Sequence, residues 1–121
     1  VGESNNVERC ETLRGFENSA PPGAKGLIRP EFIDISTEQE AVLKHASVEG
    51  RVDYVYFRGN QWLVEVSFGE HKLFAYRPLE KEVVHPGDRV FILIHRAFIV
   101  QDEKIRMAEN ELKFDPNPVD I

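Results

Sequence analysis

Cysteine is nearly absent from this sequence, and so is any long apolar run. The 121 residues include one cysteine, Cys10, which excludes an internal disulfide and favours a reducing compartment. The longest apolar run, residues 90–94, falls far short of the roughly 20 residues that a membrane-spanning helix needs. Lys and Arg number 15 against 21 Asp and Glu. The resulting net charge of −6 argues against a protein that holds nucleic acid mainly through its phosphates.

The N-terminal residues also lack the features of a signal peptide. Residues 1–6 contain neither a basic segment nor an apolar one, and the first residue is not Met. We therefore expect a piece of a longer chain. With 41% hydrophobic and 10% aromatic residues the composition is that of a folded protein, and a chain of this length can bury one ordinary core.

Alternating apolar and polar residues in the middle of the sequence predict half-buried strands. The alternation is clearest over 51–57 and 61–68, which are joined by a turn at Gly59 and Asn60. Further strands are expected at 72–76, 90–94, 97–100 and 104–107, with less regular ones at 7–13, 27–29 and 32–35. Short strands with turn residues between them predict an all-β fold, a small barrel or sandwich of antiparallel strands.

The expected domain spans 1–110, with an N-terminal strand, a loop over 17–26 and core strands over 27–107. Evidence for helices is thin: residues 38–45 could form two turns and 79–84 one turn, and neither segment has the apolar periodicity of a helical fold. The tail, 111–121, contains Pro116 and Pro118 and is expected to fray.

No pattern in the sequence predicts a catalytic, cofactor or metal site. No two glycines have the separation that a phosphate-binding loop requires. The histidines, at 45, 71, 85 and 95, lack the close pairing of a zinc site. Cys10 has no evident base and is interpreted as a buried or half-buried structural thiol, and the acids at 38, 40, 80 and 82 as solvated turn residues.

Aromatic residues gather on three successive expected strands. They are Tyr54, Tyr56, Phe57, Trp62, Phe68, Phe74 and Tyr76. Barrels that bind oligonucleotides stack bases on such residues beside positive charge, and basic residues at 51, 58, 72 and 77 lie among these. Because most of these aromatics alternate onto one face of their strand, we favour core packing, with Val52, Tyr54 and Tyr56 sharing a face.

Five short motifs follow one another in a recognisable order. They are Gly2-Glu3-Ser4-Asn5, Ile28-Arg29-Pro30-Glu31-Phe32-Ile33, Gly50-Arg51-Val52, the pair Phe57-Arg58-Gly59 and Trp62-Leu63-Val64, and Pro86-Gly87-Asp88-Arg89-Val90. Together they resemble the transport-associated oligonucleotide/oligosaccharide-binding (TOBE) region at the C-terminus of ATP-binding subunits of bacterial ABC importers. The resemblance is to the branch with maltose, polyamine, sulfate and ferric-iron importers, and it implies an OB-like barrel, with two such lobes sharing strands as a variant.

The resemblance implies an accessory domain that helps to pair two ATP-binding subunits. Its partners would be a second copy of that subunit, the transmembrane permease subunits through the parent protein, and a small anion or a regulatory protein, with no nucleic acid. ATP and Mg²⁺ would bind the nucleotide-binding domain of the parent, whose motifs are absent here, so this fragment needs no cofactor. The location would be cytoplasmic, peripheral to the inner membrane.

Five residues are candidates for the partner interface: Arg29, Glu31, Arg58, Asn60 and Trp62. Arg29 and Glu31 flank Pro30 and could hold a neighbouring loop or a partner subunit, or form only a local surface ion pair. For the alternative function, an anion sensor, the available groups are Ser67, Lys72 and the turn amides near Gly69.

Overall fold

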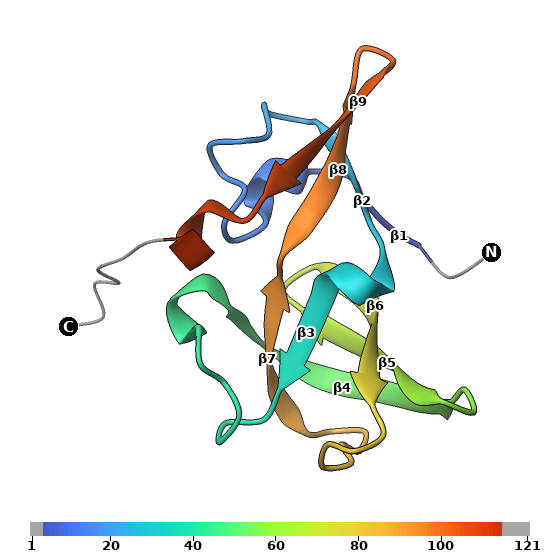
Figure 1. Cartoon of the computed structure of the whole chain (residues 1–121). Helices are drawn as coiled ribbons and strands as arrows, with labels where there is room; N and C mark the ends of the chain where they lie inside the picture. The colour runs from blue at the N-terminus through green and yellow to red at the C-terminus, as the bar shows by residue number, and fades with distance from the viewer. Residues whose placement is uncertain (1–3, 115–121) are drawn as a thin grey trace.

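The structure, a computed structural model, describes residues 4–114, and their regular elements are β-strands and short 3-10 helices (Figure 1). The strands are β1 (Asn5–Val7), β2 (Lys25–Ile28), β3 (Ile33–Ser36), β4 (Val48–Phe57), β5 (Gln61–Phe68), β6 (His71–Pro78), β7 (Arg89–Ile94), β8 (Arg96–Gln101) and β9 (Lys104–Glu109). The 3-10 helices are η1 (Cys10–Thr12), η2 (Pro30–Phe32), η3 (Lys44–Ala46) and η4 (Glu111–Phe114). The predicted all-β fold class is confirmed.

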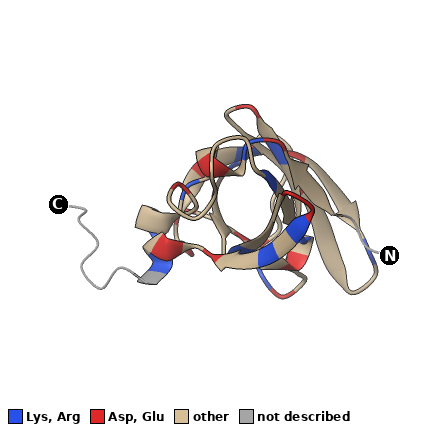
Figure 2. Cartoon of the chain, turned by 90° about the horizontal axis from the view of Figure 1, so that it is seen from above, with Lys and Arg blue, Asp and Glu red and all other residues tan. Residues whose placement is uncertain are grey.

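The strands form two antiparallel sheets. The larger sheet has the order β3-β7-β4-β5-β6 and curls until its two edge strands, β3 and β6, lie side by side, which gives a nearly closed, OB-like barrel (Figure 2). The smaller sheet has the order β1-β2-β8-β9 and stays open. His95 alone separates β7 from β8 and so carries the chain from one sheet to the other. The second lobe is thus an open sheet, and none of the strands within residues 4–114 belongs to both sheets.

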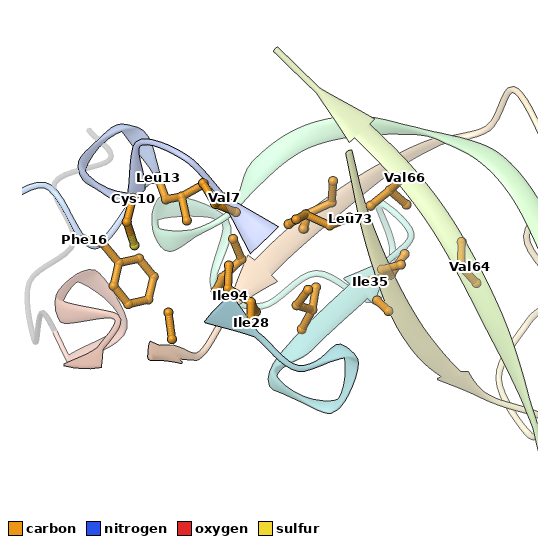
Figure 3. Close-up of a cluster of buried hydrophobic side chains, with 14 of the residues drawn as sticks. Val7, Cys10, Leu13, Phe16, Ile28, Ile35, Val64, Val66, Leu73 and Ile94 are labelled. Carbon is orange, nitrogen blue, oxygen red and sulfur yellow. The ribbon is translucent and has the colours of Figure 1, made fainter. Parts of the chain in front are cut away.

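A continuous row of buried apolar side chains joins the two lobes (Figure 3). Val64, Val66 and Leu73 fill the barrel, because alternate residues of its strands point inward. Phe16 and Ile28 continue the row under the small sheet. The N-terminal segment therefore contributes to the same core as the barrel.

The N-terminal strand differs most from its expected range. The strand expected over 7–13 ends at Val7, because Cys10 donates its N–H to Ala24 O (2.9 Å) and the chain then turns into η1. The strands expected on either side of Pro30 are β2 and β3, and Pro30 begins η2 between them. The tail begins with η4, and the rest of the segment predicted to fray lies outside the described residues.

Neither of the two segments that could have formed a short helix does so, and one side chain explains both cases. Residues 38–45 contain turns followed by the start of η3, and 79–84 contain a turn and irregular chain. Arg77 donates to Glu40 from the first segment and to the carbonyl of Glu82 from the second, at 2.7–3.1 Å. Tertiary hydrogen bonds thus override weak local helix propensity.

Arg77 also closes the seam of the barrel. Its side chain points inward from β6, is 1% exposed, and donates to Ile35 O of β3 at 2.7 Å. Glu40, 25% exposed, accepts two hydrogen bonds from the guanidinium. The hydrogen bond from Arg77, together with one from Thr37 N–H, holds the pKa of the Glu40 carboxyl below its ordinary value in spite of the opposing effect of burial.

Glu40→Ala is expected to lower the free energy of unfolding at pH 7 by about 3 kcal/mol, since it leaves a buried guanidinium without its carboxylate. The pKa of Glu40 is depressed in the folded state, so the ion pair stabilises the fold above the unfolded pKa and is lost as pH falls through the folded pKa. Urea unfolding at pH 7 and below about pH 4 should therefore show a difference between wild type and variant that shrinks in acid.

The matched control is Glu38→Ala. Glu38 pairs with Arg89, but both side chains are more than half exposed, so the cost should stay below about 1 kcal/mol. Equal losses for the two variants would contradict the seam role of Arg77 and Glu40.

The buried side chain of Asn110 joins the segment after β9 to residues 14 and 94. Its side-chain amide donates to Ile94 O at 2.8 Å and to Arg14 O at 3.3 Å, and its oxygen accepts from Leu112 N–H. Gly15 packs directly on it with φ of +99°, and a Cβ on Gly15 would lie 2.1 Å from the Asn110 Oδ1. Only glycine fits at this position.

Gly15→Ala is therefore expected to destabilise the protein by about 3 kcal/mol or more, through a clash with a buried side chain added to backbone strain. Gly59→Ala is the control, because its φ is +89° but no atom lies within 4 Å of the added Cβ. Gly59→Ala should lower the free energy of unfolding by only about 1–2 kcal/mol, because an alanine there must adopt the left-handed backbone conformation. Thermal unfolding of both variants measures the difference, and similar melting temperatures would contradict the proposed clash.

Candidate interaction surface

Within residues 4–114 the structure assembles no group of three or more metal-ligating side chains. His95 Nε2 lies 2.7 Å from Asp34 Oδ2, and His45 Nε2 lies 2.9 Å from Leu112 O, so these two histidines serve to join segments. Cys10 is fully buried, which confirms the interpretation as a structural thiol. Burial, assisted by nearby Glu11, raises the pKa of the Cys10 thiol to about 11.

Cys10 should react with a thiol reagent at pH 8 at least about 100-fold more slowly in the folded protein than in denaturant, because burial suppresses both access and the thiolate. In a C10S background, Ile105→Cys supplies the control, since Ile105 is 65% exposed and its replacement should react at the rate of a free thiol. Mass-spectrometric labelling rates measure both. Rapid labelling of native Cys10 would contradict its structural role.

The most distinctive surface is the outer face of β4, β5 and β6, which carries aromatic residues. Tyr54 is 58% exposed and Tyr56 is 43% exposed, and their rings stack with centroids 6.2 Å apart. Phe74 and Tyr76 of β6 point to the same side and are half-buried. We call these four residues the aromatic surface.

A β-bulge produces this surface and corrects the predicted core packing. The pairing of β4 with β5 skips Asp53, so Val52 faces the core while Tyr54 and Tyr56 face outward. The prediction that these three residues share a face is therefore wrong, because one extra residue reverses the orientation of the residues that follow. Asp53 is a carboxylate between apolar neighbours, but only the pairing of β4 with β5 shows that it is the residue skipped.

Leu63 shows that the aromatic surface is packed rather than loose. It is 1% exposed but lies outside the main core, because its side chain points outward from β5. Its cross-strand neighbours are Tyr56 and Tyr76. Residues directly opposite across a sheet have their Cβ atoms about 5 Å apart, so the side chains of these neighbours can shield Leu63 from solvent.

The predicted pair Arg29 and Glu31 borders this surface. Arg29 Nε lies 2.6 Å from Glu31 Oε2, and both side chains are about half exposed. The hydrogen bond from Arg29 lowers the pKa of the Glu31 carboxyl. With Gln61, Tyr76 and Asp34 the pair lines an open groove of about 500 Å³. The structure therefore brings this predicted pair to the edge of the aromatic surface, beside η2.

The other three predicted residues lie in the β4–β5 hairpin, which projects from the barrel at the lower right of Figure 1. Arg58 and Asn60 occupy its tip. Trp62 lies on the inner side, packs against the core and meets the ring of Phe57 edge-on at 5.3 Å. The hairpin thus carries aromatic groups on both faces.

Two of the residues proposed for an anion site, Ser67 and Lys72, lie directly opposite each other on β5 and β6, beside the turn that contains Gly69. Ser67 and Gly69 border one groove, which also contains Arg51, Arg89 and Glu49, while Lys72 borders another. The Ser67 hydroxyl is 3.3 Å from Asp53 Oδ1, to which it donates. A carboxylate in hydrogen-bond contact with Ser67 disfavours a bound oxyanion there.

These features describe a small β-barrel with a preorganised aromatic surface and with positive and negative charges interspersed around it (Figure 2). A family model for the TOBE domain matches residues 26–100, which include the whole barrel from β3 to β7. The chain belongs to the TOBE domain family. No curated protein matches it significantly. β1 and β9, the edges of the small sheet, lie outside the matched residues.

Proposed function

We propose that this chain is an accessory, regulatory and dimerisation domain of the ATP-binding subunit of an ABC importer. The observation that supports it most strongly is the TOBE family match, which covers the complete barrel. The sequence has no phosphate-binding loop, so ATP and Mg²⁺ would bind a nucleotide-binding domain elsewhere in the parent protein. The domain itself would hydrolyse no ATP.

The mechanical role requires a body that keeps its shape while the motor domains open and close. The barrel supplies one, because Arg77 ties together its two edge strands and the core runs unbroken into the small sheet. Contact with a second copy would then keep two motor domains together when ATP no longer bridges them.

We place the domain on the cytoplasmic side of the inner membrane, held there by the permease subunits that the parent protein binds. No helix among the described residues is long and apolar enough to cross a membrane. Transported substrate and permease contacts belong to other parts of such a transporter, and the chemistry of this domain does not specify them.

The experiment compares the complete ATP-binding subunit with a version that lacks this domain. Both should bind ATP, because the phosphate-binding groups lie elsewhere. After ATP removal, the complete subunit should remain associated at protein concentrations where the truncated one dissociates, with at least about a tenfold difference in dissociation constant. Light scattering over a range of protein concentrations measures the association of each protein. Equal association of the two proteins would contradict the proposed role.

A further inference from the structure

We propose that His95 is a proton-sensitive clasp between the barrel and η4: the neutral ring holds Lys113, and protonation of the ring releases Lys113 while the contact with Asp34 remains. His95 separates β7 from β8, where the chain passes from the barrel to the small sheet (Figure 1). The inference does not depend on the proposed function. It assigns a conformational response to the junction of the two lobes.

The main chain of His95 is held on both sides. Its N–H donates to Phe32 O at 2.8 Å, and its carbonyl accepts from Asn110 N–H at 2.9 Å. These bonds attach the residue to η2 on one side and to the residue that follows β9 on the other. They join peptide groups, which do not titrate. A change in the charge of the ring therefore leaves the path of the chain from β7 to β8 in place.

Both ring nitrogens of His95 have a charged neighbour. Nε2 lies 2.7 Å from Asp34 Oδ2 of β3, and Nδ1 lies 3.3 Å from Lys113 Nζ of η4. The Lys113 side chain is 11% exposed, whereas that of Asp34 is more than half exposed. The ring thus joins an edge strand of the barrel to the segment after β9, and the lysine contact is the more buried of the two.

The two neighbours allow only one protonation state of the ring. An ammonium group has no lone pair, so Lys113 must donate to Nδ1, which then carries no proton. An ionised carboxylate only accepts, so Nε2 must carry the proton and donate it to Asp34. Neutral His95 with its proton on Nε2 satisfies both contacts, and the other neutral tautomer satisfies neither.

A second proton on the ring changes the two contacts in opposite directions. Nδ1–H would face the Lys113 ammonium group, donor against donor and cation against cation, so that contact is lost. The Nε2–H bond to Asp34 becomes a hydrogen bond between two ions and is strengthened. The charged ring is therefore held by the barrel alone.

The other charged groups near the ring do not respond in the same range of pH. Histidine side chains ordinarily change charge between pH 5 and 8, whereas carboxylates and ammonium groups titrate outside this range. Lys113 also lies 3.0 Å from Glu109 Oε1, and Arg96 Nε lies 2.9 Å from Glu109 Oε2. Hydrogen bonds from Arg96 and Lys113 hold the pKa of the Glu109 carboxyl below its ordinary value. Lys113 therefore keeps Glu109 as a partner when the ring releases it.

His45 also holds η4, but its contact does not depend on the charge of its ring. His45 Nε2 lies 2.9 Å from Leu112 O, and a carbonyl only accepts, so Nε2 carries a proton in the neutral ring and in the charged one. Leu112 N–H is bound by the Asn110 side chain as well. Protonation is therefore expected to loosen η4 around Lys113 and not to detach the whole turn.

NMR spectroscopy of the 121-residue chain at about pH 5.5 and about pH 7.5 tests the clasp. Nuclear Overhauser contacts between the side chains of residues 95 and 113 should be present at the higher pH and lost at the lower one. Contacts between the side chains of residues 95 and 34 should persist at both. A 95–113 contact that persists at pH 5.5, or that is absent at pH 7.5, overturns the proposal.

Two replacements of His95 separate the functions of its ring, and neither replacement titrates. His95→Asn keeps an oxygen near the position of Nδ1, so it can still accept from Lys113 and should retain the 95–113 contact at both pH values. His95→Gln keeps an N–H near the position of Nε2 but no acceptor for Lys113, so it should lack the contact at both.

His45→Gln is the matched control, because its amide N–H can still donate to Leu112 O. Its 95–113 contact should depend on pH as in wild type, and a contact that no longer depends on pH would assign the response to His45 and overturn the proposal. Loss of the contact at low pH in His95→Asn would assign the response to another group, with the same consequence. Amide spectra of each variant, compared with wild type, exclude loss of folding as the cause.

Discussion

The barrel depends on the hydrogen bonds across its open seam. β3 and β6 are the two edges of a five-stranded sheet, and they face each other without a regular ladder between them. An edge whose backbone groups are buried without partners is costly, so the seam needs donors and acceptors from elsewhere. Arg77 supplies one solution by reaching from β6 to Ile35 O on β3.

Asn5 supplies further hydrogen bonds to the edge of the barrel. Its side-chain amide accepts from Phe74 N–H and donates to Phe74 O and Ile28 O, at 2.7–3.0 Å, and so takes the place of a peptide group in a neighbouring strand. Through this side chain β1, which belongs to the small sheet, is attached to the edge of the barrel. The two lobes are thus connected by polar contacts at the seam as well as by the common core. The proposed mechanical role requires a rigid body of this kind.

The same strands have an inner face that makes the barrel and an outer face that carries the aromatic surface. On β5 the residues Val64 and Val66 face inward, while Leu63 faces outward and is buried only by its neighbours. Packing on both faces gives the exposed tyrosines a rigid base.

Alternation of residue types was sufficient to predict the strands from β4 onward and the antiparallel arrangement, because the period of two reflects burial on one side of a sheet, but it misplaced the N-terminal strand. The motif around Pro30 likewise predicted the pair Arg29 and Glu31, whose partners are local in sequence. Three features were not predictable: the outward direction of Tyr54 and Tyr56, the failure of both short helices, and the closeness of Gly15 and Asn110. Each depends on contacts between residues far apart in the chain.

What the sequence determined by itself is the set of strands and the family, since both follow from local patterns of polarity, glycine and proline. What only the tertiary structure decided is which residues face outward and how the barrel closes. A single bulge at Asp53 reverses the side chains after it, and the value of a hydrogen bond from Arg77 depends on where its acceptors lie in space. A local sequence pattern contains neither the orientation of these side chains nor the positions of the acceptors, because both are fixed by the packing of the whole chain.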